Sequence, residues 1–326
     1  MNARKLWAYL LVLLVVAGVF IFSEFVFLKK TGEKETAPIL KVTPGAIEEV
    51  RWQRGAEVIE VKKNKTWEIV QPLRAAADPL VLEGVLQGLS LLKAERSFQP
   101  SGGDLAEYGL NPPQTIISFS AQGRRQEVRI GAQATVGNAR YFQASGSEPV
   151  HLVEVFSLKE LDRDLLALRE KKVFSLLPEQ VEKVEIRSGP NNLEINRTEK
   201  GWTDKRVPGR LLSRNKVESF VGELLRVKAR AFLDGEKEVP SWGLQAPSLW
   251  VRLTGGGGKT QETLIGGAET PDKGLYARSS RFSPALIIEG GLAGKVPADP
   301  GEWEEKATPP GSPTPKPAPQ VEKKGS

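Results

Sequence analysis

Alternating apolar and polar positions mark two series of short strands along the chain. The segments are rich in β-branched and aromatic residues and are bounded by turn-forming residues, which is typical of half-buried strands. The first series comprises residues 47–54, 58–63, 67–70, 115–120, 127–130, 141–144 and 150–153, and the later series includes residues 249–254, 262–265, 275–279 and 285–288. The short connections between segments predict hairpin-linked, antiparallel pairing.

Helical spacing of apolar residues interrupts each series once. Asp78 is a good N-cap with Pro79 at the first helical position, and an apolar stripe follows. Its members are Leu80, Leu82, Val85, Leu86, Leu89 and Leu92. The later counterpart begins at Ser213 and carries Val217, Phe220, Val221, Leu224, Leu225 and Val227. Each helix therefore has one face to bury against a sheet, and the predicted fold class is α+β.

The two series are copies of one unit. Landmarks of the first half recur 134 or 135 residues later, in the same order. The pairs are Val50 with Val184, Trp67 with Trp202, Asp78 with Ser213, Tyr108-Gly109-Leu110 with Trp242-Gly243-Leu244, and Ile130-Gly131 with Ile265-Gly266. We therefore predict a tandem repeat of two mostly antiparallel-sheet-plus-helix domains, at residues 39–156 and 178–297.

Two further segments adjoin the repeats. Ser157 and Glu160 match a capping box at the start of a leucine-rich stretch, so residues 157–177 are predicted to contain a connecting helix that packs one lobe against the other. The second copy shows no such helix at its end. Residues 298–326 are rich in Pro, Lys, Glu and Gly, which predicts a disordered tail.

The N-terminal residues have the pattern of a membrane anchor. The apolar stretch begins at Leu6 and extends to Leu28, with Glu24 as its only charge. At 1.5 Å per residue it can span a hydrocarbon core of about 30 Å. A cleaved signal peptide is the alternative, but its apolar region is usually about 7 to 15 residues long. We expect a transmembrane helix within residues 1–30 and a linker at residues 31–38.

The orientation of this helix follows from its short N-terminal tail. Basic residues flank both ends, with Arg4 and Lys5 before the apolar stretch and Lys29 and Lys30 after it. A very short tail ahead of such a stretch usually stays in the cytoplasm. We therefore expect the repeats to lie outside the cytoplasmic (inner) membrane, which is the periplasm in a Gram-negative cell.

The amino-acid composition excludes several kinds of partner and functional site. The 326 residues carry 46 basic and 40 acidic side chains, and the net charge of +6 is spread along the chain. Nucleic-acid binding usually requires clustered Lys and Arg, so no nucleic acid is expected as a partner. The chain has no cysteine and a single histidine, His151, which excludes disulfides, thiolate catalysis and a histidine-rich metal site. We predict no catalytic residues, no cofactor and no metal ligands.

A glycine run ending in Gly258-Lys259-Thr260 invites comparison with a phosphate-binding loop. That motif requires a glycine five residues before Gly258, where this chain has Leu253, and a helix afterwards, where a strand is expected. Gly258 also aligns with Gly123 in the other copy. Both positions are therefore predicted to be hairpin turns, and no nucleotide is expected.

The remaining candidate residues favour structural roles. Trp67 and Trp202 occupy equivalent positions, which favours core packing over a ligand-stacking platform. Tyr108 and Trp242 are expected to be hydrophobic plugs where a short turn stops, and Gly109 can take the left-handed conformation that ends it. His151 alternates with apolar neighbours, so it is expected to be a strand-surface or partly buried residue.

Several of these features together resemble a known family. They are the N-terminal membrane helix, Trp67 ahead of a turn at Pro72, the leucine-rich helix, Tyr108-Gly109-Leu110-Asn111-Pro112, Ile130-Gly131, Tyr141-Phe142 and Leu168-Arg169-Glu170-Lys171. From about residue 40 to 290 the chain resembles the bacterial domain of unknown function 4340 family. In the second copy Trp242 replaces the tyrosine, and the leucine-arginine stretch is missing. The resemblance implies an accessory, extracytoplasmic partner of an ABC-type transport system, including systems related to gliding motility, and it implies no enzyme.

The sequence thus favours a non-enzymatic, membrane-anchored, extracytoplasmic protein that binds a transporter or cell-envelope partner. Two alternatives stay open. One is an extracytoplasmic module that binds a glycan or lipid at the junction of the lobes. The other is an anchored hydrolase that uses carboxylates alone.

Overall fold

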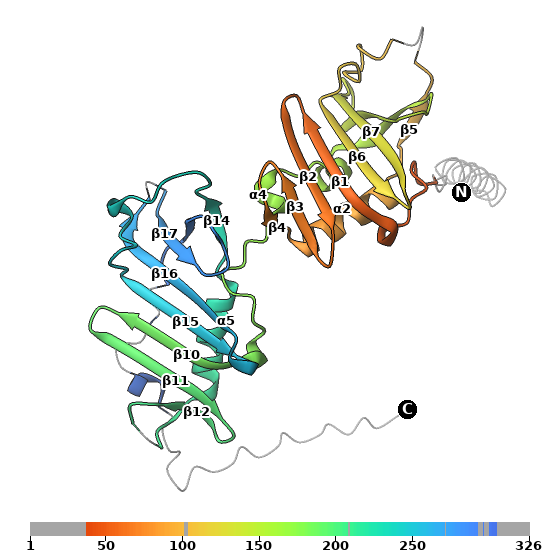
Figure 1. The fold of residues 1–326 in the computed structure, drawn as a ribbon. Coiled ribbons are helices and arrows are strands. Elements are labelled where there is room, and N and C mark those ends of the chain that lie inside the picture. Colours follow the sequence, from red (N-terminus) through yellow and green to blue (C-terminus); the bar gives the residue numbers. More distant parts are fainter. Residues whose placement is uncertain are drawn as a thin grey trace, which may run out of the picture. The chain divides into compact units, whose positions relative to one another are not determined.

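The structure consists of two similar units. The computed structural model describes residues 37–100, 104–207, 209–270, 272–292, 296 and 300–304. The chain divides into two compact units between Glu170 and Lys171. Each unit contains a nine-stranded antiparallel sheet with a few helices (Figure 1). The expected antiparallel sheets in tandem are confirmed, and both units are mostly β.

The first unit has the strand order β4-β3-β2-β1-β6-β7-β8-β9-β5. Its strands are β1 (Ile47–Arg54), β2 (Glu57–Lys63), β3 (Trp67–Gln71), β4 (Ala75–Ala76), β5 (Arg96–Phe98), β6 (Thr115–Ala121), β7 (Arg124–Gln133), β8 (Ala139–Ala144) and β9 (Val150–Glu154). It also contains the 3-10 turn η1 (Pro44–Ala46) and the helices α2 (Pro79–Leu91), α3 (Val155–Leu161) and α4 (Leu165–Leu168). The edge strands β4 and β5 were not expected, because two or three residues are too few to show alternation.

The second unit repeats this order as β13-β12-β11-β10-β15-β16-β17-β18-β14. Its strands are β10 (Val181–Ser188), β11 (Asn191–Thr198), β12 (Gly201–Asp204), β13 (Leu211–Leu212), β14 (Ala229–Phe232), β15 (Leu249–Gly255), β16 (Thr260–Glu269), β17 (Gly274–Ser279) and β18 (Leu286–Glu289). Its helical elements are η3 (Pro178–Gln180), α5 (Arg214–Arg226), η4 (Pro240–Trp242), η5 (Gly256–Gly258) and η7 (Pro300–Trp303). Strand for strand, the two sheets have the same topology, as the duplication predicts.

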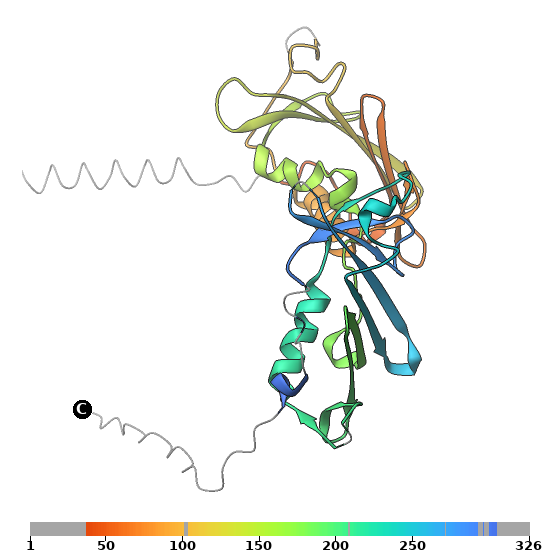
Figure 2. The ribbon, with the colours of Figure 1, turned by 90° about the vertical axis from the view of Figure 1, so that its left-hand side faces the viewer.

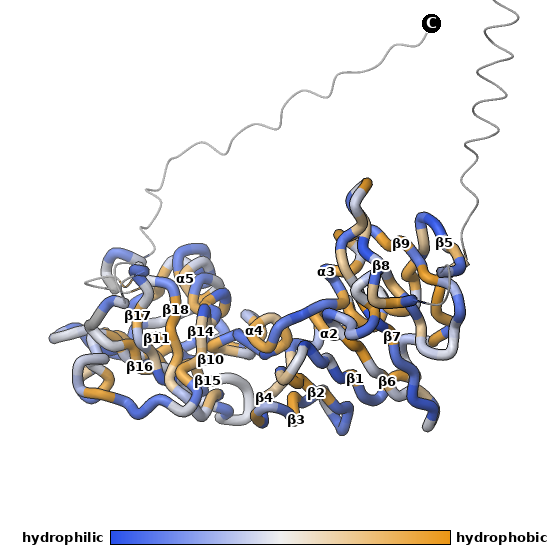
Figure 3. The backbone as a smooth tube through the Cα atoms, turned by 90° about the horizontal axis from the view of Figure 1, so that it is seen from above, coloured by the Kyte–Doolittle hydropathy of each residue, from blue (hydrophilic) through white to orange (hydrophobic). Residues whose placement is uncertain are grey.

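Strand register places the apolar positions of each unit on one face of its sheet. Val50 lies opposite Val61 on one side and Phe119 on the other, and Trp52 is the next residue on that face. All four side chains are buried in the first core. Figure 3 shows hydrophobic and hydrophilic positions interleaved along the strands of both units. The alternation in the sequence therefore corresponds to a core face and a polar face.

Helices cover the core face of each sheet (Figure 2). The expected cap of α2 is confirmed, because the Asp78 carboxylate accepts the backbone amides of Leu80 at 3.0 Å and Val81 at 3.3 Å. The buried residues of this helix are Leu82, Val85, Leu86 and Leu89. Leu80 was expected in the same stripe, yet it is 71% exposed. In α5 the buried residues are Val217, Phe220, Val221 and Leu224, and Ser213 makes no side-chain cap.

The helix predicted to begin at the Ser157 capping box is two short helices instead. The first, α3, begins two residues earlier and has no side-chain cap. The chain leaves helical geometry at Asp162 and resumes at Asp164, which caps α4 by accepting the Ala167 amide at 2.6 Å. Asp162 stops the helix because its carboxylate is bound by Arg54 of β1. Both helices pack against α2 within the first unit.

The second unit extends into the region that was predicted to be a disordered tail. Residues 300–304 form η7 and an isolated bridge between Leu212 and Glu304. Trp303 is 9% exposed and belongs to the second core. Because Trp303 fills that core, residues 300–304 are part of the second unit, and the remainder of the predicted tail from residue 305 lies outside the described residues.

The predicted anchor, from Leu6 to Leu28, lies outside the described residues, as do the greater part of the linker and residues 305–326. Among the helices that the structure describes, none is long and apolar enough to cross a membrane.

Candidate functional site

Two glycines of α2 provide the surface on which α3 rests. A side chain at Gly88 would meet Leu161 of α3, and one at Gly84 would approach Glu160. The lack of side chains lets the two helices approach closely. The positions of Gly84 and Gly88 in the second unit are occupied by Ser219 and Glu223. The two glycines thus mark the repeat in which α3 packs closely on the covering helix.

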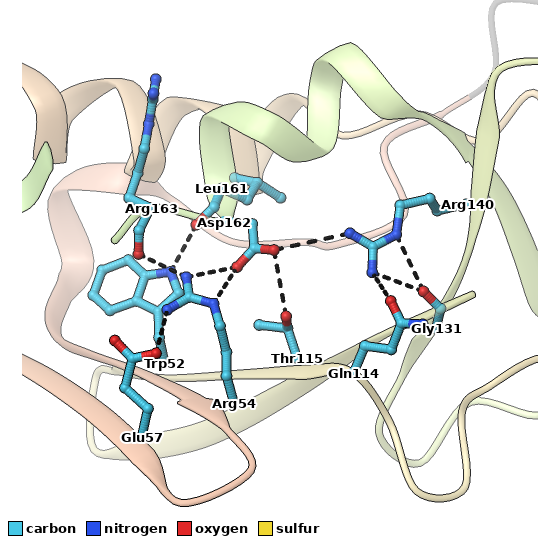
Figure 4. A network of polar contacts seen from close by, with 10 residues as sticks. All are labelled: Trp52, Arg54, Glu57, Gln114, Thr115, Gly131, Arg140, Leu161, Asp162 and Arg163. Carbon is cyan, nitrogen blue, oxygen red and sulfur yellow. Dashed lines mark hydrogen bonds and ion pairs between the residues drawn. The ribbon is translucent and has the colours of Figure 1, made fainter. Parts of the chain in front are cut away.

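A buried indole fixes the C-terminal end of α3 to the sheet (Figure 4). The Nε1 group of Trp52 in β1 donates a hydrogen bond to the carbonyl oxygen of Leu161 at 2.6 Å. Trp52 is fully buried, so this bond satisfies a donor that water cannot reach. It also satisfies one of the free carbonyl groups at the end of a helix.

A cluster of charges surrounds the same helix end (Figure 4). Arg54 donates to the Asp162 carboxylate through Nε at 2.9 Å and Nη2 at 2.6 Å. Its Nη2 group also donates to the carbonyl oxygen of Arg163 at 2.7 Å. The other Asp162 oxygen accepts the Thr115 hydroxyl at 3.3 Å and lies 3.8 Å from Nη1 of Arg140. We call Arg54, Thr115, Arg140 and Asp162 the Asp162 cluster.

Arg140 connects the cluster to strand β7 and to the start of β6. Its guanidinium donates to the carbonyl oxygen of Gly131 at 3.1 and 2.8 Å and to the side-chain oxygen of Gln114 at 2.7 Å. Burial lowers the pKa of Arg140, and the nearby Asp162 carboxylate opposes that shift. Each charged group of the cluster is engaged by neighbours within the first unit. The arrangement holds α3 in place.

The second unit has no equivalent of the Asp162 cluster in its described residues. Ser188, Leu249 and Leu275 stand at the positions of Arg54, Thr115 and Arg140. These replacements remove the guanidinium groups of Arg54 and Arg140 and the hydroxyl group of Thr115. The two sheets therefore have the same strand order, but the described residues on their core faces differ.

The helix layer of the first unit exposes large apolar side chains. Leu80 and Leu91 of α2 are 71% and 64% exposed, and Phe156 of α3 is 70% exposed. We call these three residues the first-unit helix face. Their counterparts in the second unit are Asn215, Arg226 and Gly291. The apolar surface is thus a property of one repeat and is not required by the shared fold.

The second unit has a pocket where the first unit has the beginning of α3. Its volume is about 340 Å³, and it lies between the end of α5, the edge strand β14 and the chain that follows β18. The lining residues are Glu223, Arg226, Val227, Lys228, Ala229, Arg230, Glu289, Gly290, Gly291 and Leu292. We call this the second-unit pocket. Glu223 and Gly291 correspond to Gly88 and Phe156, so the pocket occupies the place of the first turn of α3.

His151 lies on β9 beside the edge strand β5. Its Nδ1 atom is 2.8 Å from the Ser97 hydroxyl, with which it forms a hydrogen bond. The ring is 9% exposed, and burial lowers the pKa of His151. It borders a cavity of about 400 Å³ that Ala37, Pro38 and Ile39 also line. Of the strand-surface and partly buried positions expected for it, His151 takes the more buried one, and it connects two neighbouring strands.

The two recurring tryptophans are buried in their cores to different degrees. Trp202 is 1% exposed, which confirms its predicted core role. Trp67 is half-buried and packs against the first core from its edge. Trp52, which the sequence interpretation overlooked, is more deeply buried than Trp67 and is fully enclosed in the first core. Its alternation with Val50 was the available signal.

The Tyr-Gly-Leu motif docks onto a glycine of a neighbouring strand. The carbonyl oxygen of Tyr108 accepts the Ala132 amide at 2.9 Å, and a Cβ at Gly131 would overlap that carbonyl oxygen. The Tyr108 ring contacts the Tyr141 ring edge-on, with 4.9 Å between centroids. Gly109 is left-handed, with φ of 62°, as predicted. The motif therefore lies where two backbone segments approach each other closely.

The same docking recurs in the second unit. A Cβ at Gly266 would overlap the carbonyl oxygen of Trp242, whose ring stacks on Tyr276 with 5.0 Å between centroids. The glycine run is the predicted hairpin turn, since η5 joins β15 directly to β16. In the described part of the chain, no group of three or more histidine, aspartate and glutamate residues is placed to hold a metal ion.

The geometry defines a class: tandem nine-stranded antiparallel units, each with a helix against its core face, and with α3 packed beside that helix in the first unit. The chain belongs to the family described as Domain of unknown function (DUF4340), whose model matches residues 67–247 and so spans parts of both units. No curated protein and no solved structure matches the chain.

Proposed function

We propose that this chain is a non-enzymatic, membrane-anchored protein, located outside the cytoplasmic membrane, that binds a component of an ABC-type transport or cell-envelope system. The second-unit pocket is the docking position for that partner. The anchor from Leu6 to Leu28 supplies the membrane attachment, and the family resemblance supplies the transport context.

One observation carries the docking position. The two units share topology, and α3 occupies in the first unit the place where the described residues of the second unit line a pocket. The first unit therefore provides an internal precedent for a short segment that packs at this position. The pocket volume of about 340 Å³ accommodates a few side chains of such a segment.

The lining of the pocket determines the chemistry of the segment it accepts. Arg226, Lys228 and Arg230 outnumber Glu223 and Glu289. Arg230 is also paired with Asp272 at 2.9 Å. A partner segment with acidic side chains complements Arg226 and Lys228, and electrostatic complementarity of this kind favours specific association.

Crosslinking of the full chain in intact cells, followed by detergent purification, tests the proposal. Three forms are compared: the natural chain, the double variant Arg226→Glu with Lys228→Glu, and the control Lys259→Glu in an exposed hairpin turn. The natural chain and the control are expected to recover identified transporter or envelope proteins, and the double variant is expected to lose them.

Two results would contradict the proposal. Full recovery of the same proteins by the double variant would reject the second-unit pocket as the docking position. Recovery of the chain alone, together with a rise in its thermal stability on adding glycans or lipids, would favour the ligand-binding alternative.

A further inference from the structure

The first-unit helix face is an apolar surface without a partner among the described residues. Leu80 and Leu91 are eleven positions apart on α2, which places them on the same side of the helix and roughly 16 Å apart along its axis. Phe156 comes from α3, the helix packed beside α2. With exposures between 64% and 71%, these side chains contribute little to the core of the first unit.

The helix that carries Phe156, α3, is fixed at its C-terminal end. Leu161 is buried against Gly88, and its carbonyl oxygen accepts the indole of Trp52. The Asp162 cluster fixes the following residue to β1 and β6. Because one end of α3 is fixed in this way, Phe156 keeps a defined position beside α2.

The chain enters the first unit at the same end of α2. The backbone amide of Ile39 donates to the carbonyl oxygen of Leu92 at 2.8 Å, and Leu40 is buried in the core. Leu92 directly follows the exposed Leu91. Ile39 is nine positions after Lys30, which follows the apolar stretch. Such a segment spans at most about 30 Å when extended.

We infer that the first-unit helix face rests on the surface of the phospholipid bilayer that holds the anchor. The inference depends on the proposed anchor, which keeps Ile39, bonded to Leu92 beside Leu91, within about 30 Å of the lipid. Leucine and phenylalanine side chains on the exposed side of a helix insert into the boundary between headgroups and acyl chains. The three exposed side chains come from two neighbouring helices, an arrangement that suits a soft planar surface.

The second unit supplies the contrast. Asn215 and Arg226 replace Leu80 and Leu91 on a helix of the same length in the same fold. Exposed leucines at these positions are therefore not needed to build the sheet and its covering helix. Their presence in the repeat nearest the anchor along the chain is the observation that favours lipid as the occupant.

Site-specific fluorescence on the full chain tests the inference, and the absence of natural cysteine makes it direct. The variants Leu80→Cys, Leu91→Cys and Phe156→Cys each receive an environment-sensitive label, with Asn215→Cys and Ser219→Cys as matched controls on α5. Each labelled chain is reconstituted into vesicles of phosphatidylethanolamine and phosphatidylglycerol. Flotation of the vesicles is measured first, and then quenching by lipid-borne nitroxides and by aqueous iodide.

The expected result is strong lipid quenching and weak iodide quenching at the three first-unit positions, with the reverse at the two controls. Chains that float with vesicles but show equal iodide access at all five positions would overturn the lipid contact and leave the anchor intact. Chains that fail to float would overturn the anchor and the inference together. Labels shielded from iodide only as protein concentration rises, without lipid quenching, would assign the face to a second copy and reject lipid.

Discussion

The backbone amide of Asp78 donates to the carbonyl oxygen of Leu168 at 2.8 Å, so the chain returns to the start of α2 before it leaves the first unit. The same contact joins Ser213 to Trp303 in the second unit. Trp303 lies 135 residues after Leu168, which is the spacing of the repeat. Each unit therefore closes in the same way, and the repeat continues to the end of η7.

Closure of the second unit predicts a sharp boundary for deletion. Trp303→Ala should lower the free energy of unfolding by about 3–5 kcal/mol, because it empties a buried site beside Phe220. Truncation after Glu304 should leave that free energy unchanged. Denaturant unfolding followed by circular dichroism measures both. Equal midpoints for Trp303→Ala and the natural chain would show that η7 is not part of the core.

The docking of Tyr108 and Trp242 predicts that two glycines tolerate no side chain. Gly131→Ala and Gly266→Ala should each cost about 1–3 kcal/mol of stability, because a methyl group must displace a backbone carbonyl. Gly267→Ala is the matched control, since its Cβ would meet only Ser248 at an ordinary 3.8 Å. Thermal melting of the three variants separates the cases, and a Gly266 variant as stable as the Gly267 variant would refute the close approach.

The Asp162 cluster predicts that substitutions of two nearby aspartates differ strongly in their effect on stability. Asp162→Asn should lose about 1.5–3 kcal/mol of stability, because it removes the charge that Arg54 and Arg140 surround. Asp164→Asn should be nearly neutral, because asparagine also caps a helix such as α4. Hydrogen exchange of the α3 amides offers a local readout. Protection unchanged in Asp162→Asn would mean that α3 does not depend on the cluster.

His151 predicts a pH dependence with a definite sign. Burial lowers the pKa of the folded state below the ordinary value of 6.5, so the unfolded chain binds the proton more tightly. The contribution of neutral His151 is complete above pH 6.5 and is lost as the pH falls below that value towards the folded pKa. The melting temperature should therefore drop as the pH falls below 6.5.

The variant His151→Asn isolates this effect. As the only histidine is then removed, the loss of stability over the same pH range should become smaller. An identical pH profile for the natural chain and the variant would assign the dependence to carboxyl groups.

Local signals in the sequence were sufficient for the elements that local chemistry determines. The cap at Asp78, the left-handed turn at Gly109 and the hairpin turn at Gly258 each depend on residues within a few positions. The duplication extended those predictions from one unit to the other. Strand order was repeated as expected because equivalent apolar patterns build equivalent cores.

The remaining features depend on contacts between distant residues. Asp162 ends α3 because Arg54, 108 positions away, binds its carboxylate, and no helical pattern records that bond. Trp303 was assigned to the tail because the surrounding prolines dominate the composition. Leu80 fitted the apolar stripe by spacing, although the helix turns it towards the exposed side. The site asymmetry appears only when Gly88 is compared with Glu223 in the folded units.

In the proposed topology, the anchor holds both units outside the cytoplasmic membrane. Two reporters fused after Ser326 decide this, one active only in the periplasm and one active only in the cytoplasm. The periplasmic reporter should be active and the cytoplasmic one silent. Cytoplasmic activity with a silent periplasmic reporter would place both units on the other side of the membrane and rule this topology out.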